Sequence, residues 1–143
     1  MPHIERSALV NHSAEQMFDL VNDISRYPEY MSGCNAARVL SQDENHLLGE
    51  LTLGKAGIEF TFTTRNQLHA PERIDMELES GSFKEFEACW QFQSLGENAC
   101  KVSLSMDFEF ESGLVGFAAE KLFASVANAQ VDALVNRANE LYG

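Results

Sequence analysis

Apolar and polar residues alternate with a period of two through the middle of the chain, from residue 36 to residue 110. In the first clear stretch, Phe60 and Phe62 share one face of an extended segment, while Thr61 lies on the other. Turns rich in glycine or proline separate the stretches, so the pattern predicts an antiparallel meander with one apolar face. The alternation is clearest at residues 58–63, 74–79, 85–92 and 102–110.

Two segments have helical spacing instead. Ser13 and Gln16 form the signature of a capping box, and apolar residues then recur every three or four positions. Pro28 lacks an amide hydrogen, so this helix is predicted to run from Ser13 to about Arg26. A second helix is predicted from Ser112 to about Tyr142, and its first half is apolar around most of its circumference.

A strand-like segment at residues 4–11 opens the chain, so the predicted order is strand, helix, meander and long helix. The most economical packing curls the sheet around the last helix, which is apolar on more than one side. This arrangement is a helix-grip fold of the α+β class. Neither a repeat nor a linker interrupts the pattern, so residues 1–143 are predicted to form a single domain.

Composition adds limits on partners and compartment. The chain has 143 residues and a net charge of −12, which disfavours binding to the phosphate backbone of DNA or RNA and to anionic lipid surfaces. Three scattered cysteines without metal or redox spacing predict a reducing compartment. Because the first residues lack a secretory signal and no apolar run is long enough to span a membrane, we expect a cytoplasmic protein. Transient contact with a membrane is compatible with this composition.

Catalytic and metal-binding patterns are missing from the sequence. His3, His12, His46 and His69 lie far apart without the spacing of metal ligands, so they are predicted to be surface residues. The sequence contains neither a nucleophile motif nor a glycine-rich phosphate loop. Most carboxylates fall on the polar phase of the strands, where a solvated group does little chemistry. We therefore expect no enzyme activity, no metal and no cofactor.

Aromatic residues are the unusual feature of the chain. Eight of the ten phenylalanines lie between residues 60 and 117, together with the one tryptophan, Trp90. A packed core explains any one of them. As a set, they also fit an apolar pocket, because a strongly curved sheet around one helix leaves unfilled volume. The candidate lining residues are Phe60, Phe62, Met76, Trp90, Phe92, Met106, Phe108, Phe117, Leu122 and Val126.

Several motifs together resemble the START-like helix-grip superfamily, in particular its coenzyme Q-binding and RatA-type subgroup within the polyketide cyclase/dehydrase-like proteins. The resemblance covers essentially the whole chain and implies a small lipid-binding fold without catalytic residues. It also implies that Tyr27, Pro28, Trp90 and Phe92 are family motif residues, of which Tyr27 and Pro28 shape the pocket entrance. The motifs are VNDISRYPEY at 21–30, Gly33-Cys34, AGIEFTFTTRN at 56–66, GSFKEFEACWQF at 81–92 and DFEF at 107–110.

Two functions follow from this resemblance. The main expectation is non-enzymatic binding of ubiquinone or a similar isoprenoid lipid in support of respiratory electron transport. The alternative is a RatA-type toxin that inhibits the association of ribosomal subunits, with the large ribosomal subunit as the partner. The net charge of −12 argues against broad contact with ribosomal RNA, but an acidic surface favours docking on a basic ribosomal protein.

Overall fold

In the computed structural model, which describes residues 3–55, 57–111 and 114–143, seven strands form one antiparallel sheet. Its order is β1-β7-β6-β5-β4-β3-β2, so every pair except β1 and β7 consists of consecutive strands. The predicted meander is therefore confirmed. The strands are β1 (His3–Val10), β2 (Cys34–Gln42), β3 (His46–Lys55), β4 (Ile58–His69), β5 (Arg73–Ser80), β6 (Phe83–Gly96) and β7 (Ala99–Phe110).

The first strand forms one edge of the sheet and pairs with the last strand. In the antiparallel register of β1 and β7, His3 lies opposite Asp107 and Val10 lies opposite Cys100. The inward side chains of both strands, such as Ile4 and Leu104, are buried. Two distant parts of the chain therefore share one layer of the core.

Helix α1 (Ala14–Asn22) begins at the predicted capping box. The amide of Gln16 donates to the Ser13 hydroxyl over 3.1 Å, and the Ser13 amide donates to the side chain of Gln16 over 3.0 Å. These bonds satisfy amide groups that the first helical turn leaves free. Met17, which is fully buried, points from the apolar face of this helix into the core.

The first helix is shorter than predicted. Its α-helical part ends at Asn22 rather than near Arg26, and a separate 3₁₀ helix, η1 (Ile24–Glu29), follows. Pro28 lies inside η1 and disfavours the α conformation at the preceding residue. The tighter turn redirects the chain from α1 toward β2.

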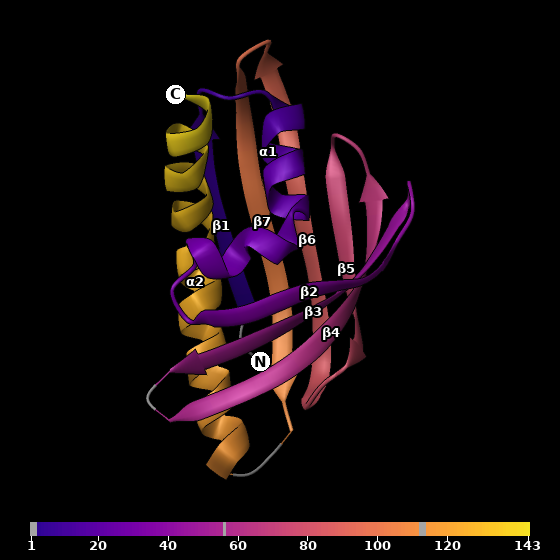
Figure 1. Cartoon of the computed structure of the whole chain (residues 1–143), viewed down its shortest axis with the longest axis vertical. Coiled ribbons are helices and arrows are strands. Elements are labelled where there is room, and N and C mark those ends of the chain that lie inside the picture. The colour runs from indigo at the N-terminus through magenta and orange to yellow at the C-terminus, as the bar shows by residue number, and fades with distance from the viewer. Residues whose placement is uncertain (1–2, 56, 112–113) are drawn as a thin grey trace.

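Helix α2 (Leu114–Tyr142) runs along the concave side of the sheet, and Figure 1 shows β2, β3 and β4 sweeping across it. The helix contacts β1 and β7 near one edge of the sheet and β3 and β4 on the other side. Its Val131 and Leu134 side chains are almost fully buried. The predicted helix-grip architecture is confirmed, while the predicted start at Ser112 lies outside the described residues.

Phe123 of α2 is the centre of an aromatic cluster. Its ring centroid lies 4.7–6.4 Å from the centroids of six other phenylalanine rings, most of them in edge-to-face or tilted geometry. These six rings come from three strands, so the cluster joins the helix to the sheet. They belong to Phe60, Phe62, Phe83, Phe86, Phe108 and Phe110.

Candidate ligand pocket

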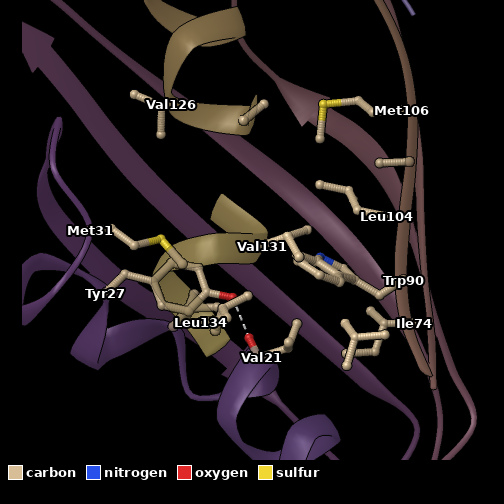
Figure 2. Close-up of a cluster of buried hydrophobic side chains, with 14 of the residues drawn as sticks. Val21, Tyr27, Met31, Ile74, Trp90, Leu104, Met106, Val126, Val131 and Leu134 are labelled. Carbon is tan, nitrogen blue, oxygen red and sulfur yellow. Dashed lines mark hydrogen bonds between the residues drawn. The ribbon is translucent and has the colours of Figure 1, made fainter. Parts of the chain in front are cut away.

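A cavity lies between the concave face of the sheet and α2, and the end of α1 and η1 cover it. The centre of a water-sized molecule can occupy about 50 Å³ of it. Figure 2 shows Trp90 and Ile74 from the sheet, Val131 from α2 and Tyr27 from η1 converging in this region. The space holds a few waters or a small group, so a larger ligand requires the wall to move.

Five of the ten predicted lining residues are on the cavity wall. Their common feature is a position near the middle of the sheet or of α2, where the cavity lies. That any of them contacts a ligand stays a prediction. The five are Phe62, Met76, Trp90, Met106 and Val126.

Four other predicted residues lie inward but away from the cavity, so the prediction that they line it is wrong. Phe92 is displaced toward α1, where its ring centroid lies 5.7 Å from that of Phe18. Phe60, Phe108 and Leu122 lie in the core beside the pocket rather than on its wall. Strand phase gives the face of the sheet, but not the position of the cavity along each strand.

Phe117 was also predicted to line the pocket, but its side chain lies on the surface. Its side chain is 60% exposed, and the Lys121 ammonium lies 4.7 Å from its ring centroid. This residue is on the outer side of α2, so it cannot line the cavity. The apolar character of the helix in this region therefore does not reflect burial on all sides.

Polar residues on the wall were missed in the sequence. Thr64 and Asn66 of β4 both face the cavity and are each 6% exposed. The same alternation that places Phe62 inward, continued two and four residues further, would have found them. Asn22, at the end of α1, also lines the cavity, but no pattern in the sequence indicates its direction.

Tyr27, a motif residue expected at the entrance, contributes to the wall from η1. Its hydroxyl donates to the backbone carbonyl of Val21 at the end of α1, as Figure 2 shows. Burial raises the pKa of Tyr27 well above its ordinary value, although a hydrogen bond with Gln130 opposes this shift. The phenol is therefore neutral at physiological pH and joins η1 to α1.

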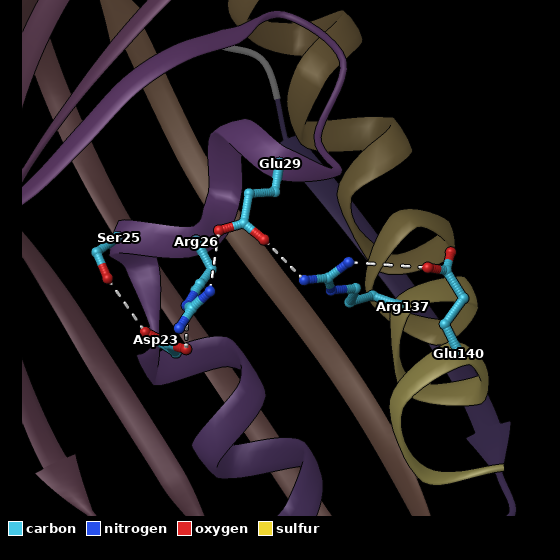
Figure 3. A network of polar contacts seen from close by, with 6 residues as sticks. All are labelled: Asp23, Ser25, Arg26, Glu29, Arg137 and Glu140. Atoms are coloured by element: carbon cyan, nitrogen blue, oxygen red, sulfur yellow. Dashed lines mark hydrogen bonds and ion pairs between the residues drawn. The ribbon is translucent and has the colours of Figure 1, made fainter.

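Ion pairs join η1, which contributes to the cavity wall, to α2 (Figure 3). The Arg137 guanidinium of α2 lies 2.9 Å from the Glu29 carboxylate and 3.7 Å from that of Glu140. The same guanidinium lies 5.1 Å from the ring centroid of Tyr30. Arg26 also pairs with Glu29, over 3.2 Å, so a short network holds the segment that covers the pocket.

Among the described residues that line the cavity, none is charged at neutral pH. Cys34 provides the one thiol among these described lining residues, and burial raises its pKa to about 11. The wall therefore favours a neutral ligand, and it offers neither a carboxylate pair nor a histidine for acid–base chemistry.

Slow thiol labelling is expected from this shift. At pH 8, a thiol with a pKa of about 11 has about 100-fold less thiolate than one with a pKa of 9, and the thiolate is the reactive form. Cys34 should react slowly with iodoacetamide and faster as the pH rises toward 11, followed by mass analysis of the modified peptides. The chain unfolded in urea provides the control. Labelling of folded Cys34 at the unfolded rate would contradict the shift.

His12 departs from the predicted surface position. It is 4% exposed, and its Nε2 atom lies 2.8 Å from Oδ1 of Asn139, because the turn before α1 packs against the end of α2. His3, His46 and His69 are exposed as predicted. Across residues 3–55, 57–111 and 114–143, no group of three histidine, cysteine or acidic side chains could hold a metal ion.

Comparison with known proteins places this geometry in a family. A family model described as "Polyketide cyclase / dehydrase and lipid transport" matches residues 10–135. The chain belongs to this family. The START-like resemblance is thereby confirmed, and the family description includes both enzymes and lipid carriers.

Within the polyketide cyclase/dehydrase and lipid transport family, the chain has relatives of two kinds. It is 45% identical to "Ribosome association toxin RatA" of Pseudomonas aeruginosa, over 99% of this chain and 98% of that protein. It is 26% identical to "Coenzyme Q-binding protein COQ10 homolog B, mitochondrial" of Xenopus laevis, over 96% of this chain and 58% of that protein. The sequence is thus closer to the RatA protein than to the coenzyme Q-binding protein.

A solved structure shares the fold of the family. The START superfamily protein from Mycobacterium smegmatis superposes with a TM-score of 0.79 at 21% identity, covering 97% of this chain and 98% of that one. Within the described ranges of the present chain, no helix combines the length and hydropathy of a membrane-spanning segment.

Proposed function

We propose that this chain acts on the ribosome as a RatA-type toxin that inhibits the association of ribosomal subunits, without catalysing a reaction. The observation that carries this proposal is the 45% identity to a ribosome association toxin over almost the full length of both chains. It supports the alternative expectation from the sequence better than the ubiquinone carrier. A cytoplasmic location follows from the proposed partner.

The distribution of charge favours a basic ribosomal protein over the RNA backbone as the contact. All six arginines lie within 4 Å of a carboxylate, so few cations are left for phosphate groups. The net charge of −12 instead complements a lysine- and arginine-rich protein surface. The large subunit is the proposed partner.

Expression of the chain in bacteria should change the ribosome profile. In a sucrose gradient, we expect free subunits to accumulate at the expense of assembled ribosomes, because the bound protein blocks joining. Purified protein added to separated subunits should sediment with the large subunit and reproduce the block. An unchanged profile at high expression, together with no co-sedimentation, would refute the proposal.

A second candidate function is binding of ubiquinone or a similar isoprenoid lipid in the cavity. The neutral wall with its aromatic side chains supports it, as does the 26% identity to a coenzyme Q-binding protein. The available space of about 50 Å³ is smaller than such a ligand. Binding therefore requires the cavity wall to move.

Lipid binding can be tested separately from ribosome binding. We expect a lipid in organic extracts of the purified protein, and quenching of Trp90 fluorescence by a short-tail ubiquinone, since Trp90 is the only tryptophan and lines the cavity. Ala127→Leu should fill the cavity and abolish quenching, whereas Ala129→Leu on the exposed side of α2 should not.

The same pair of variants relates the two functions. If subunit joining is blocked through the outer surface, Ala127→Leu should retain the ribosome effect while losing the ligand. If the effect on the ribosome disappears with the ligand, the toxin activity depends on a filled pocket. Absence of both lipid and quenching in the unmodified chain would refute the second function alone.

A further inference from the structure

Besides Tyr27 of η1 and Gln130 of α2, which hydrogen-bond with each other, three side chains with amide or hydroxyl groups line the largely apolar cavity. Thr64 and Asn66 project inward from β4, and Asn22 projects from the end of α1. The Thr64 hydroxyl donates a hydrogen bond to Oδ1 of Asn66 over 2.9 Å. A purely apolar ligand could not form hydrogen bonds with these groups.

Their hydrogen-bonding capacity is incompletely used. Oδ1 of Asn22 is buried and has no hydrogen-bond partner among the described residues. The Asn66 amide nitrogen carries two hydrogens, and neither is used in the Thr64–Asn66 hydrogen bond. The Thr64 oxygen, having donated its hydrogen to Asn66, can still accept one. The wall thus presents an acceptor that lacks a donor, and it also carries the amide hydrogens of Asn66.

We propose that the pocket selects an aromatic ligand whose head group both donates and accepts hydrogen bonds, so that it prefers a quinol to the corresponding quinone. This inference rests on the proposed ligand-binding function. In the orientation that the Asn22 amide has in this structure, its Oδ1 atom requires a donor. A quinone has carbonyl oxygens, which only accept, so it can pair with the Asn66 amide but leaves Oδ1 of Asn22 unsatisfied. A quinol has hydroxyl groups that can donate to Asn22 and still accept from Asn66. Trp90, Phe62 and Phe86 provide aromatic contacts for its ring.

The expected preference can be estimated from the cost of an unpaired group. A buried acceptor left without a donor weakens binding by roughly 10-fold or more relative to the paired state. The quinol form of a ubiquinone with one isoprene unit should therefore bind about 10-fold more tightly than the quinone form.

Equilibrium dialysis under anaerobic conditions tests this inference, with the bound quinol and quinone quantified by chromatography. Asn22→Leu removes the acceptor while keeping a side chain of similar size, so it should abolish the preference by weakening quinol binding alone. Asn136→Leu, on the exposed side of α2, is the matched control and should leave both affinities unchanged.

The possible outcomes distinguish the quinol preference from the ligand-binding function on which it rests. Equal affinities for the two forms, or tighter binding of the quinone, would overturn the preference while leaving the pocket a ligand site. A preference that survives Asn22→Leu would overturn the role of Asn22. Failure of both forms to bind the unmodified chain would overturn the ligand-binding function, and the preference with it.

Discussion

Phe123→Ala is expected to lower the free energy of unfolding by about 3–5 kcal/mol, the range for removal of a buried phenylalanine side chain. Phe123 is 4% exposed and contacts six other phenylalanine rings from three strands. Its removal would leave a cavity that rings on different strands cannot close together. Urea denaturation followed by Trp90 fluorescence would measure the loss.

Phe117→Ala is the matched control, because it is the same substitution on the same helix. Phe117 is 60% exposed, so we expect a change within about 0.5 kcal/mol. The slope of unfolding free energy against urea should be unchanged in both variants if the unfolded state is unaffected. Similar losses for the two variants would contradict the assignment of Phe123 as the centre of the cluster.

Arg137→Ala is expected to lower the free energy of unfolding by about 1–2 kcal/mol, mainly through lost packing of its side chain. The Arg137 side chain is 18% exposed, pairs with Glu29 and Glu140, and covers the ring of Tyr30. Its loss removes both the ion pairs and the packing that hold η1 against α2. Because η1 covers the cavity, the variant should also exchange its backbone amides faster in residues 24–29, measured by hydrogen exchange.

Arg26→Ala is the control that removes an exposed charge from the same network. Arg26 pairs with the same Glu29 carboxylate but is 61% exposed, so its loss should cost less than about 1 kcal/mol. Added salt should diminish the small effect of Arg26→Ala further, since screening weakens exposed pairs. An equal loss in both variants would indicate that the packing of Arg137 over Tyr30 contributes little.

Much of the fold could be predicted because it depends on local periodicity. Alternation along the strands, the capping box at Ser13 and the apolar second helix gave the element order and the helix-grip arrangement. The break after Asn22 could not be placed, because the α and 3₁₀ conformations differ little over a few residues before a proline. That break determines how the chain covers the cavity.

Only five of the ten predicted site residues lie on the cavity wall, and the reason differs from the one that limits prediction of the fold. Whether an inward residue lines the cavity depends on what packs over it from another element. Phe92 and Trp90 share one face of β6, yet Phe18 of α1 covers Phe92 while Trp90 stays on the wall. The periodicity of one strand does not indicate which residues of another element pack against it.

The pairing of β1 with β7 has a consequence for biosynthesis. His3 and Asp107 are 104 residues apart in the chain, so β1 has no partner strand until β7 has been made. Helix α2, which covers the concave apolar face, is translated after all seven strands. Such non-local pairing slows folding, because the entropy of the long loop is lost before its contacts form. The nascent chain should thus acquire its native core only after α2 has been made, and products truncated before α2 should aggregate through their uncovered sheet.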